Sequence, residues 1–268
     1  MFHLELFHFP EPFCFNLPVV LTETRIFVID TYMGPSSIPE IVDYCKKVKG
    51  DRKLYVVNTH SHFDHIWGNS AFKDWEIIAH RKCFEVIKSE GENTLKEISE
   101  KYPEWIKEEI ELVLPNFIFE KEINFYDRDG NVEIKHLPGH TEDSSVIIIR
   151  PENILIAGDM VEDPFPLLER TGIDTYIRNL KYLEDRNFSR VIPSHGQRQD
   201  SLLIKDNIHY LEELRDRVIY FLKKGEDPHE ENITVESIVK FRGDISPFYR
   251  ESHENNIKKA VKNFGNDQ

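Results

Sequence analysis

Cysteine is scarce in this sequence, and its three residues, Cys14, Cys45 and Cys83, form no C-x-x-C pair. An odd, widely spaced set of cysteines argues against a disulfide framework and for a reducing compartment. Long hydrophobic runs are also missing, since no stretch approaches the roughly 18 apolar residues that a membrane span needs. The N-terminus lacks a basic region followed by an apolar stretch, so no targeting segment is expected. These absences predict a cytoplasmic protein that does not associate with membranes.

Basic residues are outnumbered, with 34 Lys and Arg against 48 Asp and Glu, for a formal net charge of −14. So acidic a surface repels phosphate backbones, which argues against nucleic acid as a partner. The composition is nevertheless that of a globular chain, because 40% of its 268 residues are hydrophobic and 12% are aromatic. We therefore expect a small-molecule substrate, while the oligomeric state is left open.

Short apolar runs alternate with helical patterns through the first two hundred residues. Apolar or alternating runs predict strands at residues 25–30, 54–58, 75–79, 132–137, 144–150, 153–157 and 190–193. Residues 39–49 form a helical pattern between the first two of these runs, and residues 151–153 provide the turn of a hairpin. Mixed strands and helices of this kind indicate α/β layers around one core.

Two stretches differ from this pattern in composition. Residues 85–122 are charge-rich and read as a helical insertion between strands. Residues 201–268 contain a strong amphipathic helix at 202–224 and shorter helical patterns at 235–241 and 255–264. We therefore divide the chain into a core of residues 1–200, which carries the insertion, and a C-terminal helical region of residues 201–268 that completes or flanks the core.

The most informative segment is Thr-His-Ser-His-Phe-Asp-His at residues 59–65, directly after the strand at 54–58. Side chains two apart in an extended chain share a face, so His60 and His62 can converge on one ion. Asp64 and His65 come from the turn that follows and can reach a second, adjacent ion. Imidazole nitrogens and carboxylate oxygens are ligands that Zn²⁺ accepts, and this segment has no cysteine for a structural thiolate site.

Three further candidates follow strands in the same way. His140 comes after Pro138-Gly139, Asp159 comes after Gly158, and His195 precedes Gly196. Each of them alone has an ordinary alternative, such as a hydrogen-bonded surface histidine or a turn residue. Together they place ligand-type side chains where strands stop and loops begin, which is where functional groups are commonly mounted on a rigid scaffold.

The motifs H-S-H-F-D-H, P-G-H-T, A-G-D and P-S-H-G, spread over about residues 15–197, resemble the metallo-β-lactamase superfamily. The resemblance implies a four-layered αββα sandwich with the metal centre at one edge, to which this chain adds the C-terminal helical region. It also implies two groups of metal ligands. His60, His62 and His140 would hold a first metal, Asp64, His65 and His195 would hold a second metal, and Asp159 would bridge the two.

This ligand set resembles the glyoxalase II, lactonase and related hydrolase branches. It implies two divalent ions that share a bridging hydroxide; Zn²⁺ is favoured, with Fe or Mn as alternatives. Asp64 and Asp159 are the candidate catalytic carboxylates that orient the nucleophile, with Asp64 as the proton shuttle. Thr59, Ser61 and Thr141 are candidates to fix the imidazole tautomers.

The expected activity is hydrolysis of an ester, thioester, lactone or similar small-molecule bond. The segment at residues 160–166 lacks the glycine, cysteine and arginine found there in glyoxalase II enzymes, and position 162 is Glu where quorum-quenching lactonases carry Tyr, a role left to Tyr176 or Tyr32. One alternative is a phosphodiesterase acting on a nucleotide or nucleic acid, for which Arg170, Arg178 and Arg198 would supply the basic cluster. The other alternative is a non-catalytic metal-binding protein of the same fold.

Overall fold

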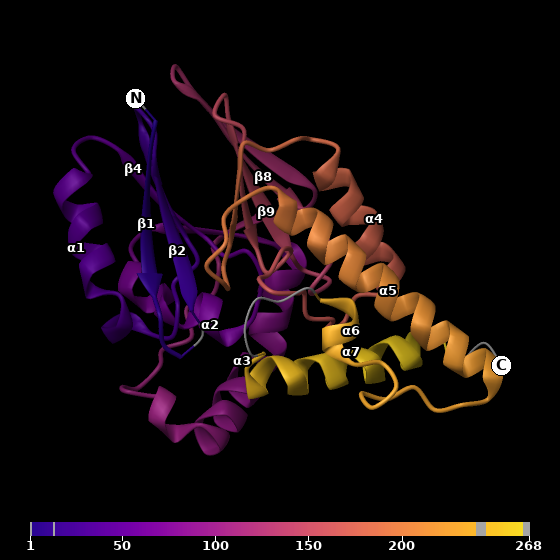
Figure 1. Cartoon of the computed structure of the whole chain (residues 1–268). Coiled ribbons are helices and arrows are strands. Elements are labelled where there is room, and N and C mark those ends of the chain that lie inside the picture. The colour runs from indigo at the N-terminus through magenta and orange to yellow at the C-terminus, as the bar shows by residue number, and fades with distance from the viewer. Residues whose placement is uncertain (1, 13, 240–244, 265–268) are drawn as a thin grey trace.

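The computed structural model describes residues 2–12, 14–239 and 245–264, and it contains two β-sheets packed face to face with helices over both outer faces (Figure 1). In sheet order, the first sheet consists of β1 (His3–Phe9), β2 (Phe15–Leu21), β3 (Arg25–Ile29), β4 (Lys53–Val57), β5 (Glu76–His80) and β6 (Phe117–Phe119). The second sheet consists of β11 (Arg190–Pro193), β10 (Ile154–Gly158), β9 (Ser145–Arg150), β8 (Gly130–His136) and β7 (Glu122–Asp127).

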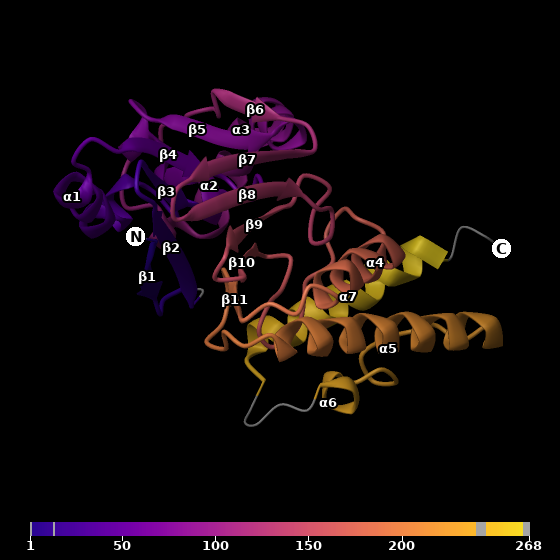
Figure 2. The ribbon, with the colours of Figure 1, turned by 90° about the horizontal axis from the view of Figure 1, so that it is seen from above.

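The helices lie on either side of this pair of sheets, so that the molecule is built in layers (Figure 2). The α-helices are α1 (Pro39–Val48), α2 (Phe63–Ile66), α3 (Arg81–Lys101), α4 (Ile173–Glu184), α5 (Leu202–Lys224), α6 (Val235–Ile238) and α7 (Pro247–Phe264). Short 3₁₀ turns are present at Pro35–Ser37, Trp67–Phe72 and Pro103–Trp105. Within the described ranges, no helix is both long enough and apolar enough to cross a bilayer.

The central strands are apolar on both faces because each face packs against a different layer. In β9, Ile147 and Ile149 join the cluster between the two sheets, whereas Val146 and Ile148 belong to the cluster that α4 and α5 cover. All four side chains are fully buried, and burial of each stabilises the fold by about 1.5–3 kcal/mol. This two-sided burial explains the continuous hydrophobic run of β9. The αββα layering expected from the resemblance is confirmed.

The C-terminal helices extend the layer that covers the second sheet. Leu180 of α4, Leu211 of α5 and Ile257 of α7 are buried in one hydrophobic cluster together with Val191 of β11. Helix α5 covers residues 202–224 as predicted, and it ends at Gly225, which adopts the left-handed conformation with φ 72°. Helix α7 therefore contacts the core through α5 and the loop that precedes α4.

Several elements differ from the predicted ones. Strands β1, β2, β6 and β7 were not predicted, and the expectation that residues 85–122 are helical is wrong beyond Lys101. Pro103 and Pro115 interrupt the helical pattern, and residues 117–119 pair with β5 as a parallel strand. Helix α7 begins eight residues before the predicted segment at 255–264. Of the predicted segment at 235–241, residues 240 and 241 lie outside the described part of the chain.

The sheet topology brings four strand ends to one edge. Strand β9 pairs antiparallel with both β8 and β10, and β10 pairs parallel with β11. The carboxyl ends of β8, β10 and β11 therefore share an edge of the second sheet, where the loops that carry His140, Asp159 and His195 begin. Strand β4 of the first sheet leads into the segment that carries His60. Residues from four distant parts of the sequence can therefore meet there.

At the same edge, two histidines connect the two sheets. The rings of His80, at the end of β5, and His136, at the end of β8, stack with centroids 3.5 Å apart and an interplanar angle of 2°. His80 Nε2 donates to the Glu120 carbonyl (2.9 Å), and its Nδ1 accepts from the backbone N–H of Lys82 (3.2 Å) at the start of α3. Burial, followed by the neighbouring His136, lowers the pKa of His80 to about 4.

We predict that His80 makes the protein less stable in acid. Because the pKa in the folded state lies below the ordinary value of 6.5, the stabilisation is complete above pH 6.5 and is lost as the pH falls towards 4. His80→Asn keeps an acceptor for the Lys82 N–H and removes the titration. Urea unfolding of metal-free protein from pH 7 to 4.5 should show that wild type loses about 1–2 kcal/mol more than the variant. Parallel pH profiles would contradict the prediction.

Candidate metal centre

The seven side chains singled out in the sequence meet at the shared strand edge. Their ligand-type atoms fall into two groups, and within each group all of these atoms lie within 4.8 Å of one another. The first group consists of His60, His62, His140 and Asp159, and the second consists of Asp64, His65 and His195. His62 and His195 are half-buried, and the other five residues are buried. The chemistry of both groups fits divalent metal ions, and Asp159 belongs to the first group.

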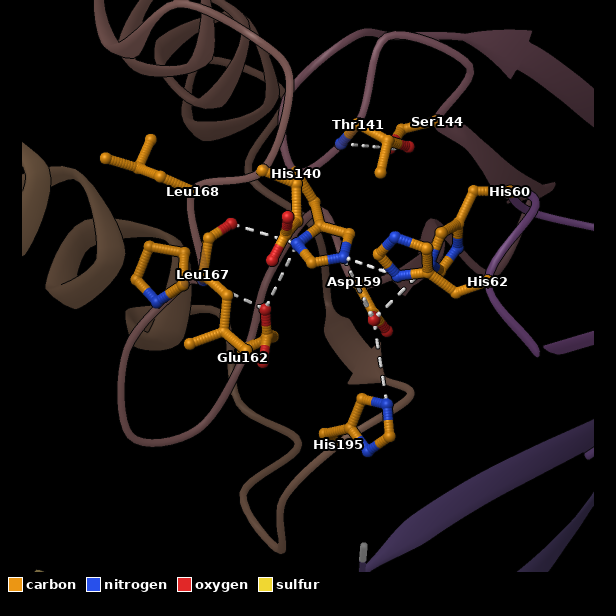
Figure 3. A network of polar contacts seen from close by, with 12 residues as sticks. His60, His62, His140, Thr141, Ser144, Asp159, Glu162, Leu167, Leu168 and His195 are labelled. Atoms are coloured by element: carbon orange, nitrogen blue, oxygen red, sulfur yellow. Dashed lines mark hydrogen bonds and ion pairs between the residues drawn. The ribbon is translucent and has the colours of Figure 1, made fainter. Parts of the chain in front are cut away.

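Asp159 lies between the two groups. Its Oδ2 atom is 3.6 Å from Nε2 of both His60 and His140 in the first group. The same oxygen is 3.4 Å from His65 Nε2 and 3.6 Å from His195 Nε2 in the second group. Figure 3 shows the carboxylate facing His60, His140 and His195. A carboxylate in this position is suited to contact ions in both groups.

Several of these atoms are buried without a hydrogen-bond partner. His60 Nε2, His65 Nε2 and Asp159 Oδ1 have no partner among the described residues. Buried polar atoms are rarely left unsatisfied, because each loses its hydration without compensation. Three such atoms at the meeting point of imidazoles and a carboxylate fit the ligand chemistry of a divalent cation of the Zn²⁺ type.

The backbone presents these residues differently from the extended strand that we predicted. Strand β4 ends at Val57, and His60 lies in the bend that follows it. His62 is the N-cap of α2, with φ −67° and ψ 148°, and Asp64 and His65 lie within that short helix. The His60–His62 pair therefore converges because of this bend, and its ring centroids are 4.6 Å apart. The expected strand face was wrong, although the expected convergence was right.

One buried carboxylate supports an imidazole in each group. His65 Nδ1 donates to Asp30 Oδ2 (2.8 Å), and the backbone N–H of Thr59 donates to Asp30 Oδ1 (2.7 Å). His60 Nδ1 lies 3.1 Å from Thr59 Oγ1, and that hydroxyl donates to Asp30 Oδ2 (2.8 Å). These bonds direct Nε2 of both rings towards Asp159. Thr59 contacts a histidine as predicted, whereas Asp30 was not among the predicted site residues.

His140 has its supporting contacts on the loop between β10 and α4. Its Nδ1 donates to the Leu167 carbonyl (2.9 Å) and lies 3.7 Å from Glu162 Oε1 (Figure 3). Its Nε2 lies 3.0 Å from His62 Nδ1. Glu162 therefore lies beside Nδ1 of His140, on the side of the ring that faces the loop. This is not the position of a tyrosine that faces a substrate. A backbone carbonyl leaves no signal in a sequence motif, so the Leu167 contact was not predictable.

The two tyrosines considered for the lactonase role, and Thr141, have other hydrogen-bond partners. The hydroxyl of Tyr176 donates to the Asp159 carbonyl (2.9 Å), and that of Tyr32 donates to the Glu11 carbonyl (2.8 Å). Thr141 Oγ1 bonds to Ser144 Oγ at 2.8 Å. Among the described residues, Ser61 makes no bond to these imidazoles. Of the three predicted tautomer-fixing residues, Thr59 is the one whose side chain bonds to a histidine of the site.

The charges of the cluster are strongly coupled. Burial alone would raise the pKa of Asp159, but His65, His195 and His60 lower it well below its ordinary value. Burial alone would lower the pKa of His65, but Asp159, Asp64 and Asp30 raise it well above its ordinary value. Carboxylates that stay ionised while buried attract positive charge. A cation site has this electrostatic character.

The arginines expected for a phosphodiester substrate have other partners. Arg170 pairs with Glu90 of α3, and Arg198 pairs with Asp200 and Asp206. Arg178 donates to Thr175 within α4. The contacts of Arg170 and Arg198 with carboxylates compensate two of these three positive charges.

A family model described as the metallo-beta-lactamase superfamily matches residues 14–195, more than half of the chain. The chain belongs to the metallo-beta-lactamase superfamily. The match begins just before β2 and ends at His195, so it contains all seven site residues and leaves the C-terminal helices outside.

Relatives within the superfamily include hydrolases of two kinds. Over 205 residues, 67% of this chain and 72% of the relative, the sequence is 28% identical to acyl-coenzyme A thioesterase MBLAC2 of Homo sapiens. Over 114 residues, 42% of this chain and 40% of the relative, it is 31% identical to an N-acyl homoserine lactonase of a Bacillus species. The solved sec-alkylsulfatase Pisa1 of a Pseudomonas species superposes with a TM-score of 0.69 at 13% identity, covering 93% of this chain and 47% of that chain. This last likeness shows the fold.

A cavity of about 710 Å³ lies at the start of α5. Its lining includes Asp163, Arg198, Lys205 and Tyr210, and none of the seven site residues. The chain segments after Asp159 and His195 meet at this cavity, because the Asp163 N–H donates to the His195 carbonyl at 3.3 Å. The cavity is therefore next to the site in the chain but is not the metal centre itself.

We predict that Asp30→Asn destabilises the metal-free protein. Asp30 has φ 62°, which asparagine tolerates, so the variant tests the carboxylate rather than the backbone. Its amide retains one acceptor oxygen for the three donors and turns an NH₂ group towards the others, at a cost of about 2–4 kcal/mol. Urea unfolding in the presence of a chelator measures this loss, with the exposed Asp51→Asn as a control. Equal stability of the two variants would show that Asp30 does not support the site.

Proposed function

We propose that this protein is a dinuclear metal-dependent hydrolase that cleaves an ester, thioester or lactone bond in a small molecule. The observation that carries the proposal is the convergence of seven ligand-type side chains in two groups around Asp159 Oδ2. The unpartnered atoms His60 Nε2 and His65 Nε2, one from each group, support a cation in both places.

In this proposal each group holds one ion. His60, His62 and His140 hold the first, Asp64, His65 and His195 hold the second, and Asp159 contacts both. A ligand set made only of imidazoles and carboxylates favours Zn²⁺, with Fe or Mn as alternatives. Two such ions supply a water of lowered pKa as the nucleophile and polarise the oxygen of the scissile group.

The two carboxylates of the centre have different surroundings, and this supports different roles. Asp159 Oδ2 faces the Nε2 atoms of four histidines. Asp64 Oδ2 faces two, being 3.3 Å from His195 Nε2 and 3.7 Å from His65 Nε2. Asp159 is therefore the bridging, orienting carboxylate, and Asp64, which faces fewer imidazoles, is the group that passes a proton to the leaving group.

The substrate class is supported by the relatives. The thioesterase and lactonase names both describe cleavage of an acyl bond. The paired states of Arg170 and Arg198 argue against a phosphodiester. An acidic chain also disfavours a polyanionic substrate such as nucleic acid.

The cysteines support a reducing compartment, and we assign the protein to the cytoplasm. Cys14, Cys45 and Cys83 are all free, and the last two are buried. Burial raises the pKa of the Cys45 thiol to about 12, which keeps that sulfur protonated and unreactive.

The metal content is predicted to be close to two ions per chain. Elemental analysis after dialysis against metal-free buffer measures it, and His60→Ala combined with His62→Ala should remove at least one ion and all hydrolytic activity. His229→Ala, an exposed histidine of the C-terminal region, should keep both ions. The proposal would be contradicted if wild-type protein contained no metal or if the double variant kept full activity.

The proposed substrate class is tested with a panel of acyl-CoA thioesters, N-acyl lactones, β-lactams and phosphodiesters, assayed with Zn²⁺, Mn²⁺ or Fe²⁺. Thioesters or lactones should be hydrolysed at least tenfold faster than any phosphodiester, measured as kcat/KM. Faster phosphodiester hydrolysis would favour the nucleotide alternative. A protein that binds two ions yet turns over no member of the panel would favour a non-catalytic role.

A further inference from the structure

The loop of residues 160–172, between β10 and α4, holds the imidazole of His140 from the side opposite Asp159. The Leu167 carbonyl accepts from His140 Nδ1 (2.9 Å), and the Leu167 N–H donates to Glu162 Oε1 (3.0 Å). Glu162 Oε1 also lies 3.7 Å from His140 Nδ1. Figure 3 shows Glu162 and Leu167 together on this side of the ring. The direction of the His140 ring is thus fixed by the position of a loop backbone.

Two buried asparagines of the C-terminal helices hold this loop on either side of Leu167. Asn207 of α5 accepts from the Glu162 N–H (2.8 Å) and donates to the Glu162 carbonyl (2.8 Å). Asn256 of α7 accepts from the Leu168 N–H (2.8 Å) and donates to the Pro166 carbonyl (2.9 Å). Each amide therefore bonds to one backbone donor and one backbone acceptor of the loop.

Both asparagines are unusual residues for an otherwise apolar layer. Asn207 is fully buried and Asn256 is 1% exposed. A buried amide destabilises the fold unless its groups are hydrogen-bonded, so its position is set by its partners. A hydrophobic side chain would pack in this layer but could not bond to the loop. The hydrogen bonds from these asparagines to the loop are all to backbone groups, which suits them to fix the position of the loop.

Asn256 is itself held by a directed chain of hydrogen bonds. His253 Nε2 donates to the Ile233 carbonyl (2.7 Å), so its Nδ1 is free to accept from the Tyr210 hydroxyl (2.8 Å). The same hydroxyl accepts from Asn256 Nδ2 (2.9 Å). Tyr210 is on α5 and His253 is on α7, so this chain also fixes the two helices relative to each other.

We propose that Asn207 and Asn256 are positioning residues for His140, through which the C-terminal helices set the affinity of the first metal ion. This inference rests on the proposed function, because it assumes that His140 is a ligand. Hydrogen bonding of one imidazole nitrogen fixes the tautomer and the direction of the other nitrogen. A loop displaced by about 1 Å would lengthen the 2.9 Å bond to the Leu167 carbonyl beyond hydrogen-bonding range and release the ring.

Both asparagines lie outside the part of the chain that the family model matches. The superfamily match ends at residue 195, whereas Asn207 and Asn256 follow it. The loop contacts the second group at a backbone atom, because the Asp163 N–H donates to the His195 carbonyl (3.3 Å), whereas the His65 imidazole is held by Asp30. Removal of either asparagine should therefore weaken the binding of one ion and leave the binding of the other unchanged.

The test compares Asn256→Ala with Asn263→Ala in the full-length protein. Asn263 lies on the same helix and also accepts a backbone N–H, that of Ile173 (3.0 Å), but it contacts the start of α4 rather than the residues around Leu167. Zn²⁺ and Co²⁺ affinities are measured by competition with a chelator. Asn256→Ala should weaken one of the two ions about tenfold or more and alter the Co²⁺ absorption spectrum, whereas Asn263→Ala should bind both ions as wild type does.

A milder variant covers the case in which Asn256→Ala fails to fold. Tyr210→Phe keeps the ring and removes the hydroxyl that holds Asn256 Nδ2, and it should weaken the same ion about two- to fivefold. Unchanged affinity for both ions, with only a lowered Tm, would overturn the inference and leave the proposed function standing. Equal weakening of both ions would also overturn it. Wild-type protein that binds no divalent ion would overturn the proposed function itself.

Discussion

A single carboxylate oxygen, Oδ2 of Asp159, lies within 3.4–3.6 Å of the Nε2 atoms of four histidines, and the rest of the site is arranged around it. Four imidazoles and a carboxylate can be kept this close, away from water, only where their surroundings favour a cation. Each ring must also be held by a hydrogen bond to its other nitrogen. Asp30 and the Leu167 carbonyl meet the second condition for three of the four rings. Asp30 holds His65 directly and His60 through Thr59, and the Leu167 carbonyl holds His140.

These supporting contacts connect the metal centre to both halves of the molecule. Asp30 follows β3 in the first sheet, so His60 and His65 are fixed by the layer that α1 and α3 cover. His140 depends on a loop clamped by α5 and α7, beyond the second sheet. The histidines are thus positioned by different parts of the hydrophobic core, and the first group, which contains both His60 and His140, depends on the two parts together. This division explains why helices that the family match does not include are in hydrogen-bonded contact with the site.

Predictions from the sequence succeeded where a signal is local. Buried two-sided strands such as β3, β4, β9 and β10 are continuous apolar runs, and α5 has a clear helical period. Strand β2 was missed because Pro18 and Asn16 interrupt its apolar pattern, although all of its residues are buried between β1 and β3. Strand β1 was missed because it lies at the sheet edge, and its polar residues His3, Glu5 and His8 leave only a weak alternation.

The sequence by itself determined which side chains are candidate ligands, because Zn²⁺-type sites need histidine and aspartate side chains and these follow strand ends in recognisable motifs at residues 60–65, 140, 159 and 195. Only the tertiary structure decided what orients those ligands. Asp30, Glu162, Asn207 and the Leu167 carbonyl act over separations of 27 to 45 residues, and through backbone groups that every residue shares. Short motifs encode which atoms can bind a metal. The direction in which those atoms point depends on long-range packing, because an imidazole is fixed by whatever the fold brings to its second nitrogen.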